Sequence, residues 1–550
     1  MKRVLIAVLA AACATGTGET KPPPATAAAA PAATSSPQPA PAPQTTPPAK
    51  EAPKASPEKV ATGTAPAAEA PQQTSPPPAA PEPPLMPDQA FRAEQPKPLP
   101  VQPHFAAPVP VQKKLKNGAR VLIVENHQVP LVAVDVRFLH GVDADPKDRP
   151  GLAEFVADTV DEGTRTRPAQ KLAEAIEDLA AHLGAGASLE GSAVHLNCLS
   201  ETLPQALELL ADVVQNPAFR PEDVERVRVL RLTALEQKRA SLGALANDEA
   251  DRILFGPEHP WGKPSGGTPE SAAATTPADL AKFHDTWWVP NDAVISVSGD
   301  VKVDEIVKLL DEKFAGWKPK KLPALSLPPL PKLSKRSIVA LEKPTATQSQ
   351  VWVIGHLFKA NDPEAVALRV ANLPLGGMFT SRLNMNLREK HGYSYGVRSG
   401  VSLMRDTGTF AATGGIIAKN TVEAVAEYEN ELKKFSDGEV SDVELANAKE
   451  TMIRGLPASL ETNDAVSSAM GTLVSLGLPL DYYKSLPGRI TKITKGDVKR
   501  VVTKWIKPDK WPVVIVGPVG QSKTALEKLD LGPVTIAPAP GVPPKTAAAK

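Results

Sequence analysis

This 550-residue chain has little cysteine, almost no net charge and none of the repeated long apolar runs of a polytopic membrane protein. Two cysteines cannot build a fold held by several disulfides. The 62 Lys and Arg against 61 Asp and Glu leave a formal net charge of +1, so the basic footprint of DNA- and RNA-binding proteins is missing. We therefore expect no nucleic-acid partner. The composition also excludes a coiled coil and a collagen-like chain.

Proline is abundant and unevenly placed. Nearly half of the 59 prolines lie between residues 21 and 110, in a stretch rich in alanine and nearly free of aromatic residues. Such a stretch cannot bury enough apolar surface to offset chain entropy. We therefore expect residues 14–110 to form a disordered Pro/Ala linker and residues 533–550 a disordered tail. The chain between them is long enough for two cores of about 200 residues each.

The amino terminus resembles a lipoprotein signal peptide. A basic start is followed by the nine-residue apolar run Val4–Ala12, which is too short to span a bilayer. Small residues directly before Cys13 resemble a bacterial lipoprotein cleavage site, although the usual leucine stands one place early. Residues 1–13 are thus interpreted as a signal peptide that ends in a lipidated Cys13, with an ordinary cleaved signal or an uncleaved anchor as alternatives. Lipidation implies a membrane-anchored, periplasm-facing protein of the cell envelope, and Ala14 favours the outer membrane.

Local patterns predict alternating strands and helices beyond the linker. Asn117-Gly118 predicts a hairpin within 111–125. Cys198 lies in an alternating strand-like segment and is predicted to be a core residue. A further strand region is expected at 129–139, helices at 151–162, 168–183, 203–215 and 221–240, a strand at 290–300, and an interdomain connection at 317–335. In the second half we expect strands at 349–355 and 508–517 and helices at 362–372, 421–435 and 441–459.

The two halves of the chain resemble each other. The segment at 221–225 matches the segment at 440–444, with Asp223 and Asp442 separated by 219 residues. The strand-ending glycines Gly299 and Gly517 are separated by 218 residues. Two independent anchors at nearly the same offset predict a duplicated domain of about 220 residues.

Several segments resemble the M16 (insulinase/pitrilysin) peptidase family. They are, in the family's order, Arg149 to Thr164, Phe255 to Gly262, Leu280 to Asp300, Leu375 to Leu383 and Leu387 to Gly396. The resemblance implies an α+β fold of two homologous M16-type domains, each a mostly antiparallel sheet covered by helices. The expected boundaries are 111–325 for the amino-terminal type and 336–532 for the carboxy-terminal type.

The zinc motif of the family is degenerate in this chain. Active members carry His-x-x-Glu-His on a helix, where two imidazoles grip zinc and the Glu acts as general base. The matching positions here are Glu154, Ala157 and Asp158, and Glu236 falls near the position of the third ligand. We therefore expect no zinc in this chain. Three carboxylates would suit Mg²⁺ or Ca²⁺ instead, but a solvated acidic helix face is the preferred interpretation.

A second family signature is intact. In active members an Arg and a Tyr of the carboxy-terminal domain hold the substrate backbone and stabilise the tetrahedral intermediate. The matching residues are Arg388 and Tyr395, whereas Tyr393 is interpreted as packing. The chain resembles the non-metal half of the family's split enzymes. The resemblance implies a zinc-bearing M16 partner with an intact His-x-x-Glu-His and short or unfolded peptides as substrates. The alternative is a non-catalytic scaffold or peptide-binding protein of the cell envelope.

Overall fold

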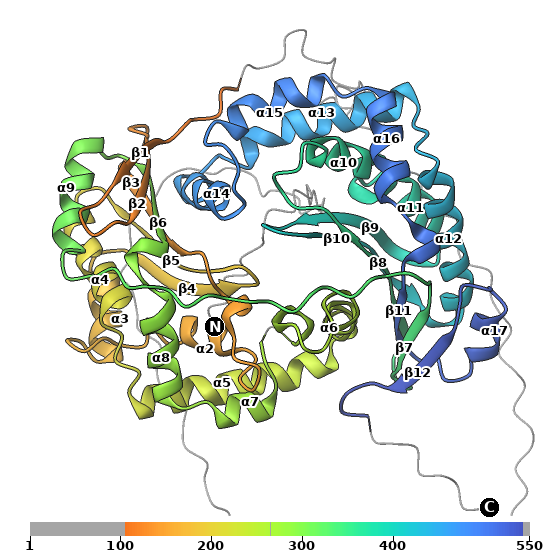
Figure 1. Cartoon of the computed structure of the whole chain (residues 1–550), viewed down its shortest axis with the longest axis horizontal. Coiled ribbons are helices and arrows are strands. Elements are labelled where there is room, and N and C mark those ends of the chain that lie inside the picture. Colours follow the sequence, from red (N-terminus) through yellow and green to blue (C-terminus); the bar gives the residue numbers. More distant parts are fainter. Residues whose placement is uncertain (1–104, 265, 543–550) are drawn as a thin grey trace, which may run out of the picture. The chain divides into compact units, whose positions relative to one another are not determined.

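The computed structural model describes residues 105–264 and 266–542, all within one compact unit (Figure 1). The predicted signal peptide with Cys13 and most of the 14–110 linker lie outside these residues. The expected end of the linker at 110 is too late, because Phe105 and the buried Ala107 already pack against the second core. Among the residues described, no helix has both the length and the apolar character that a membrane crossing requires.

Two six-stranded sheets organise the structure, and both are mostly antiparallel, as predicted. The first has the order β1-β2-β6-β3-β5-β4, with β1 (Val111–Lys114), β2 (Arg120–Glu125), β3 (Leu131–Phe138), β4 (His182–Ser188), β5 (Gly191–Leu199) and β6 (Ala293–Gly299). The second has the order β12-β7-β11-β8-β10-β9, with β7 (Ile338–Glu342), β8 (Gln348–Leu357), β9 (Ser394–Leu403), β10 (Gly408–Ile417), β11 (Val513–Gly517) and β12 (Val534–Pro538).

The two strand orders confirm the predicted duplication. Strands β2, β6, β3, β5 and β4 correspond in order and connection to β7, β11, β8, β10 and β9. The sixth strand differs, because β1 is antiparallel to β2 whereas β12 runs parallel to β7 and comes from the end of the chain. The predicted disordered tail at 533–550 is therefore wrong for 534–538, where the backbone completes the edge of the second sheet. A Pro/Ala-rich composition did not prevent this, since β12 pairs along one side only.

Helices cover both sheets. The first half contains α2 (Leu152–Ala157), α3 (Ala169–Asp178), α4 (Leu203–Gln215), α5 (Pro221–Ala240), α6 (Leu242–Phe255), α7 (Pro269–Ala274), α8 (Pro277–Trp287) and α9 (Val303–Lys313). The second contains α10 (Ala365–Asn372), α11 (Arg382–Asn384), α12 (Thr421–Ser436), α13 (Asp442–Ala458), α14 (Asn463–Ser475), α15 (Tyr482–Thr491), α16 (Lys495–Trp505) and α17 (Lys523–Glu527). Residues 318–334 connect the halves without a helix or strand.

Local sequence explains where most helices begin and end. Helix α5 starts at Pro221 with acidic residues in its first turn and ends with basic ones, which suits the helix dipole. Helix α13 begins with a capping box between Ser441 and Glu444. Two predicted helices are too long. Helix α2 ends at Ala157, before the β-branched Thr159 and Val160, and α3 ends at Asp178, because the chain reverses at Ala180 (φ 48°) and enters β4.

Two helices are exchanged between the halves (Figure 1). Helix α6 of the first half contacts β8 and β11 of the second sheet, and α14 of the second half contacts β3 and β6 of the first sheet. Leu245 and Leu254 of α6 share one core with Val514 and Val516 of β11. The two halves therefore share their cores, and each sheet is covered on one face by a helix of the other half.

The contact of α14 with the first sheet contains a buried charge cluster. Asp135 on β3 is fully buried and accepts hydrogen bonds from Arg137, with His195 Nδ1 at 2.9 Å from its carboxylate. Arg137 also donates to Ser468 and Thr472 of α14. Asp135 pairs with the residue of β6 that lies three places before Gly299. In the second sheet, Trp352 pairs with the residue of β11 that lies three places before Gly517, so Trp352 occupies the corresponding position. The two halves therefore differ at this position, with an ionic cluster in the first sheet and an aromatic side chain in the second.

Charge and hydrogen bonding set the ionisation of this cluster. Burial disfavours the Asp135 carboxylate, but the charge of Arg137 and the hydrogen bond from His195 outweigh burial and lower its pKa. Burial likewise disfavours the His195 imidazolium, but Asp135 outweighs burial and raises the pKa of His195. When His195 is protonated, its charge and that of Arg137 balance the carboxylates of Asp135 and the nearby Asp464.

Candidate functional site

Helix α2 carries the degenerate metal motif, and its amino terminus is tightly fixed. Gly151 precedes the helix with φ 85°, and a Cβ there would lie 2.6 Å from the backbone of Gly266. The Asp145 carboxylate accepts the backbone N–H groups of Gly151 (2.7 Å) and Ala153 (2.8 Å). Burial raises the pKa of Asp145 to about 8, against the opposing effect of those two hydrogen bonds. The start of helix α2 is thus held in place by the Asp145 carboxylate and by close packing against Gly266.

The three motif positions on α2 differ in environment. Ala157 is buried in the first core and carries no group that could accept a proton. Glu154 and Asp158, one turn apart, share a helix face. The Asp158 side chain is half-exposed and accepts a hydrogen bond from Arg231, and the Glu154 carboxylate lies beside Gly266. The face where the family places two imidazoles therefore presents two carboxylates.

Arg231 of α5 packs over this face of α2. The sequence analysis did not identify Arg231 as a residue of the site. Its guanidinium is 8% exposed, pairs with Asp158, and donates to the carbonyl oxygens of Gly151 (3.2 Å) and Gly266 (2.9 Å). It also lies 5.0 Å from the centre of the Phe155 ring. A fixed cation thus joins α2, α5 and the loop at Gly266. Arg231 follows Asp158 by 73 residues, close to where the third zinc ligand of the family is expected. This spacing is the feature of the sequence that could have identified Arg231.

Glu236 does not join the other two carboxylates. Its side chain is 72% exposed and pairs with Arg239 of the same helix at 3.1 Å. Arg231 and Leu235 form the buried face of α5, and five residues from Arg231 carry Glu236 more than a quarter turn off that face. Within residues 105–264 and 266–542, no group of three His, Cys, Asp or Glu side chains is placed to hold a metal. The three-carboxylate alternative therefore lacks its geometry, and zinc does not fit these residues.

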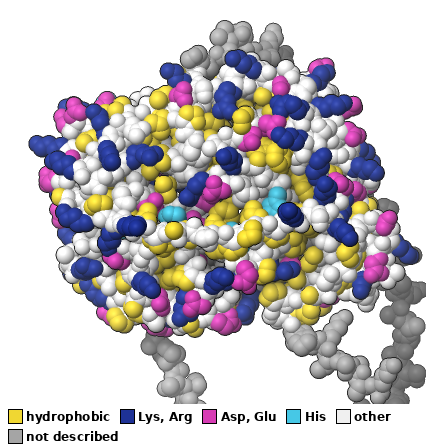
Figure 2. Space-filling view, viewed as in Figure 1, with side chains coloured by type: hydrophobic (Ala, Val, Ile, Leu, Met, Phe, Trp, Pro, Cys, Tyr) yellow, Lys and Arg dark blue, Asp and Glu magenta, His cyan; other side chains and the backbone are white. Residues whose placement is uncertain are grey.

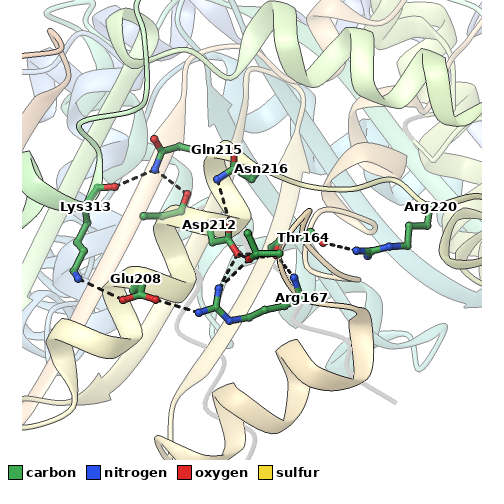
Figure 3. Close-up of polar contacts among 10 residues, drawn as sticks. Thr164, Arg167, Glu208, Asp212, Gln215, Asn216, Arg220 and Lys313 are labelled. Atoms are coloured by element: carbon green, nitrogen blue, oxygen red, sulfur yellow. Dashed lines mark hydrogen bonds and ion pairs between the residues drawn. The ribbon is translucent and has the colours of Figure 1, made fainter.

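An ion network fixes the loop that follows α2 (Figure 3). Asp212 of α4 accepts hydrogen bonds from Thr164, Thr166 and Arg167, and Arg167 reaches Glu208. Lys313 pairs with Glu208 from the end of α9. All of these side chains except Thr164 line an open pocket of about 250 Å³. Each carboxylate already faces a cation of the chain itself, so we assign the network to anchoring the loop at 163–168 on α4.

Arg388 and Tyr395 lie at the free edge of the second sheet. Arg388 belongs to a π-helical turn, Met385–Lys390, and Tyr395 is the second residue of the edge strand β9. The Arg388 side chain is 40% exposed, lies 4.8 Å from the Phe379 ring centre and pairs with Glu389 at 3.2 Å. Tyr395 is 82% exposed. Both side chains therefore reach solvent.

Two other predicted residues have packing roles. Tyr393 stacks on His391, with 4.9 Å between ring centres, and packs against the second core. Cys198 on β5 is a buried free thiol whose pKa is raised by burial to about 12, which confirms it as a core residue. Figure 2 shows positive and negative side chains interspersed over the visible face, so that face carries no continuous field of one sign.

Comparisons with known proteins agree with this arrangement. The family description "Insulinase (Peptidase family M16)" matches residues 120–248, and "Peptidase M16 inactive domain" matches residues 274–452. An "uncharacterized zinc protease" of Mycobacterium leprae is 26% identical over 386 residues, 69% of this chain and 85% of the relative. "Non-peptidase homolog YmxG" of Helicobacter pylori is 28% identical over 393 residues, 70% of this chain and 88% of the relative. A relative named as a protease and one named as a non-peptidase homologue thus match this chain at similar identity.

Solved structures show the same architecture. The peptidase M16 inactive domain from Pseudomonas fluorescens superposes with a TM-score of 0.70 at 26% identity, over 74% of this chain and 98% of that chain. A protease from Helicobacter pylori superposes with a TM-score of 0.68 at 19% identity, over 74% of this chain and 100% of that chain, and shows the fold alone.

Proposed function

Since the chain belongs to the M16 peptidase family, we propose that it is a pseudo-peptidase subunit that contributes Arg388 and Tyr395 to peptide cleavage by a related, zinc-bearing subunit. One contrast carries the proposal. The motif face of α2 has no imidazole and is covered by Arg231, whereas Arg388, on its π-helical turn, and Tyr395, on the edge strand β9, are both solvent-exposed. A pure scaffold would have no need of such a pair, so the pair favours a role in handling peptide.

The proposed roles follow from the chemistry of the two side chains. Arg388 offers a planar fork of donors that can bind a peptide carbonyl, and this geometry is not reproduced by lysine. Tyr395 offers a phenolic O–H that can donate to the oxygen on which negative charge develops during attack on the carbonyl. The metal and the general base would come from the partner subunit with an intact His-x-x-Glu-His. Short or unfolded peptides are the proposed substrates.

The test uses the full chain, alone and mixed with a related subunit that has the intact motif. Cleavage of a quenched unfolded peptide is measured with and without a chelator. We expect chelator-sensitive cleavage only in the mixture, and a loss of about 100-fold in kcat/KM for Arg388→Ala and at least about 10-fold for Tyr395→Phe. Arg454→Ala, a surface arginine of α13, and Tyr393→Phe are the matched controls. Equal activity of R388A, Y395F and the controls would refute the assigned roles.

A second function remains as the alternative outcome. A relative named "non-peptidase homolog" and the closure of α2 by Arg231 both suit a scaffold or peptide-binding protein that cleaves nothing. Absence of cleavage in every mixture would favour this function. Cleavage by the chain alone would instead overturn the interpretation of Glu154, Ala157 and Asp158 as an inactive site.

Anchoring in the cell envelope is proposed from the sequence around Cys13. Lipidation at that cysteine would place the folded part at the periplasmic side of a membrane, with the outer membrane favoured. Metabolic labelling with a radioactive fatty acid tests this location. Label in the wild-type chain that disappears in Cys13→Ser supports it, and an unlabelled wild-type chain contradicts it.

A further inference from the structure

The exposure of Tyr395 conflicts with the alternation of its own strand. On β9, Val397, Ser399 and Leu403 are buried at 0%, 7% and 6% exposure, and Arg398 between them is exposed. Successive side chains of a strand point to opposite faces. Tyr395 stands two places before Val397 and would therefore point to the buried face. It is instead 82% exposed.

A β-bulge at Tyr395 resolves this conflict. Val397 pairs with Gly414, whereas Ser394 pairs with Ile416. Two residues of β9, Tyr395 and Gly396, thus oppose the single residue Gly415 of β10. The extra residue shifts the alternation by one place, so Ser394 turns inward and Tyr395 turns outward. The corresponding hairpin of the first half, β4–β5, keeps one register along its length. The bulge is therefore a feature of the second half alone.

Two buried side chains stabilise the bulge. Ser394 Oγ accepts the backbone N–H of Gly396 at 3.0 Å and lies 2.7 Å from the Gly415 carbonyl oxygen, to which it donates. Asn384 Oδ1 accepts the backbone N–H of Val397 at 3.1 Å. Ser394 is 7% exposed and Asn384 4%. Unpaired backbone N–H groups are costly inside a protein, and these two side chains satisfy the groups at the bulge.

Asn384 also connects the bulge to the surroundings of Arg388. Its Nδ2 donates to the carbonyl oxygen of Phe379 at 2.8 Å. The Phe379 ring lies 4.8 Å from the Arg388 guanidinium, although this phenylalanine is itself 60% exposed. One amide side chain thus fixes both the strand that carries Tyr395 and the loop that carries the aromatic contact of Arg388.

We propose that Ser394 and Asn384 are positioning residues that hold Tyr395 and Arg388 in their outward orientation for peptide binding. The inference rests on the proposed function for its purpose, but the orientation itself can be measured on the chain alone. Loss of the Ser394 hydroxyl leaves the Gly396 N–H without its acceptor. The bulge then loses its internal hydrogen bond, and the regular alternation, with Tyr395 turned inward, becomes the competing register.

The first experiment maps tyrosine nitration by tetranitromethane in the full chain. In the wild type we expect rapid nitration of Tyr395 and none of Tyr428, which is 0% exposed. Ser394→Ala should lower nitration of Tyr395 towards that of Tyr428. Ser394→Thr keeps the hydroxyl and should retain wild-type nitration, as should the control Ser402→Ala on the same strand. Equal nitration of Tyr395 in S394A and S402A would overturn the proposal.

The second experiment separates this inference from the proposed function. In the mixture with the zinc-bearing subunit, Ser394→Ala should lower kcat about 10-fold or more with little change in KM, which is the pattern we also expect for Tyr395→Phe. Asn384→Asp, which keeps the acceptor but removes the donor to Phe379, should act like a weaker Arg388→Ala. If R388A and Y395F impair cleavage but S394A does not, the positioning inference fails and the proposed function stands. If R388A and Y395F are both silent, the proposed function fails whatever the nitration result.

Discussion

Replacing Arg231 by methionine tests whether a guanidinium holds the α2 face closed. Methionine keeps most of the apolar stem but removes every donor. The carbonyl oxygens of Gly151 and Gly266 then lose hydrogen bonds from a charged group, each contributing about 1.5 kcal/mol or more. The pair with Asp158 adds only about 0–1 kcal/mol, because that carboxylate is 48% exposed. We therefore expect a loss of about 3–4 kcal/mol, or a factor of about 10²–10³ in the folding equilibrium.

Urea unfolding followed by tryptophan fluorescence measures this loss. The matched control is Arg226→Met on the same helix, where the arginine is 46% exposed and pairs with Glu162 and Asp223. That control should cost no more than about 1 kcal/mol. Arg231→Lys keeps the charge but cannot make all three contacts of the guanidinium. Its loss in free energy of unfolding should therefore lie between the losses for Arg226→Met and Arg231→Met. A cost for Arg231→Met no larger than that of Arg226→Met would refute the role of Arg231 as the link between α2 and α5.

The contact of α14 with the first sheet gives two further predictions. The pKa of His195 is raised in the fold, so the stability that its protonated form contributes is fully present below about pH 6.5 and is lost as the pH rises through the folded value. His195→Gln should remove this fall of the urea midpoint above about pH 6.5, whereas the exposed His182→Gln should not. An unchanged pH profile in H195Q would contradict the prediction. Gly471→Ala should destabilise the protein by about 1–3 kcal/mol, because its Cβ would lie 2.7 Å from Arg137 Nε, whereas the unobstructed helical Gly488→Ala should stabilise it slightly. A stabilising G471A, measured by the same urea unfolding, would show that the contact is loose.

Sequence patterns predicted those elements whose signals are local. Helices α4 and α5 have the predicted bounds, because an apolar face at helical spacing and the residues at the ends of each helix are written in the segment itself. The hairpin at Asn117-Gly118 formed as predicted for the same reason. The duplication was also readable, since Gly299 and Gly517 end corresponding strands.

Elements that depend on a distant partner were misread. Strand β4, His182–Ser188, is built of glycine, alanine and few other residues and has no β-branched residue, so its sequence did not indicate a strand and the predicted helix ran into it as far as 183. Pairing with β5 makes it a strand. Strand β12 lies in a segment that composition assigned to a disordered tail, yet β7 offers it a free edge. Glu236 was placed by counting residues, and a difference of a few residues on a helix moves a side chain to another face.

The sequence by itself determined which chemical groups this protein has. It has no imidazole at residues 154 and 158, no proton-accepting side chain at residue 157, and an arginine and a tyrosine at 388 and 395. No arrangement of the backbone alters that inventory. Tertiary structure alone decided where those groups lie and which of them reach solvent. The link between Arg231 and Asp158 spans 73 residues, and the direction of Tyr395 depends on a one-residue shift between β9 and β10. The ion pair and the strand register both depend on contacts between segments that are distant in the sequence. The energy of such a contact depends on both segments, so neither segment predicts it alone.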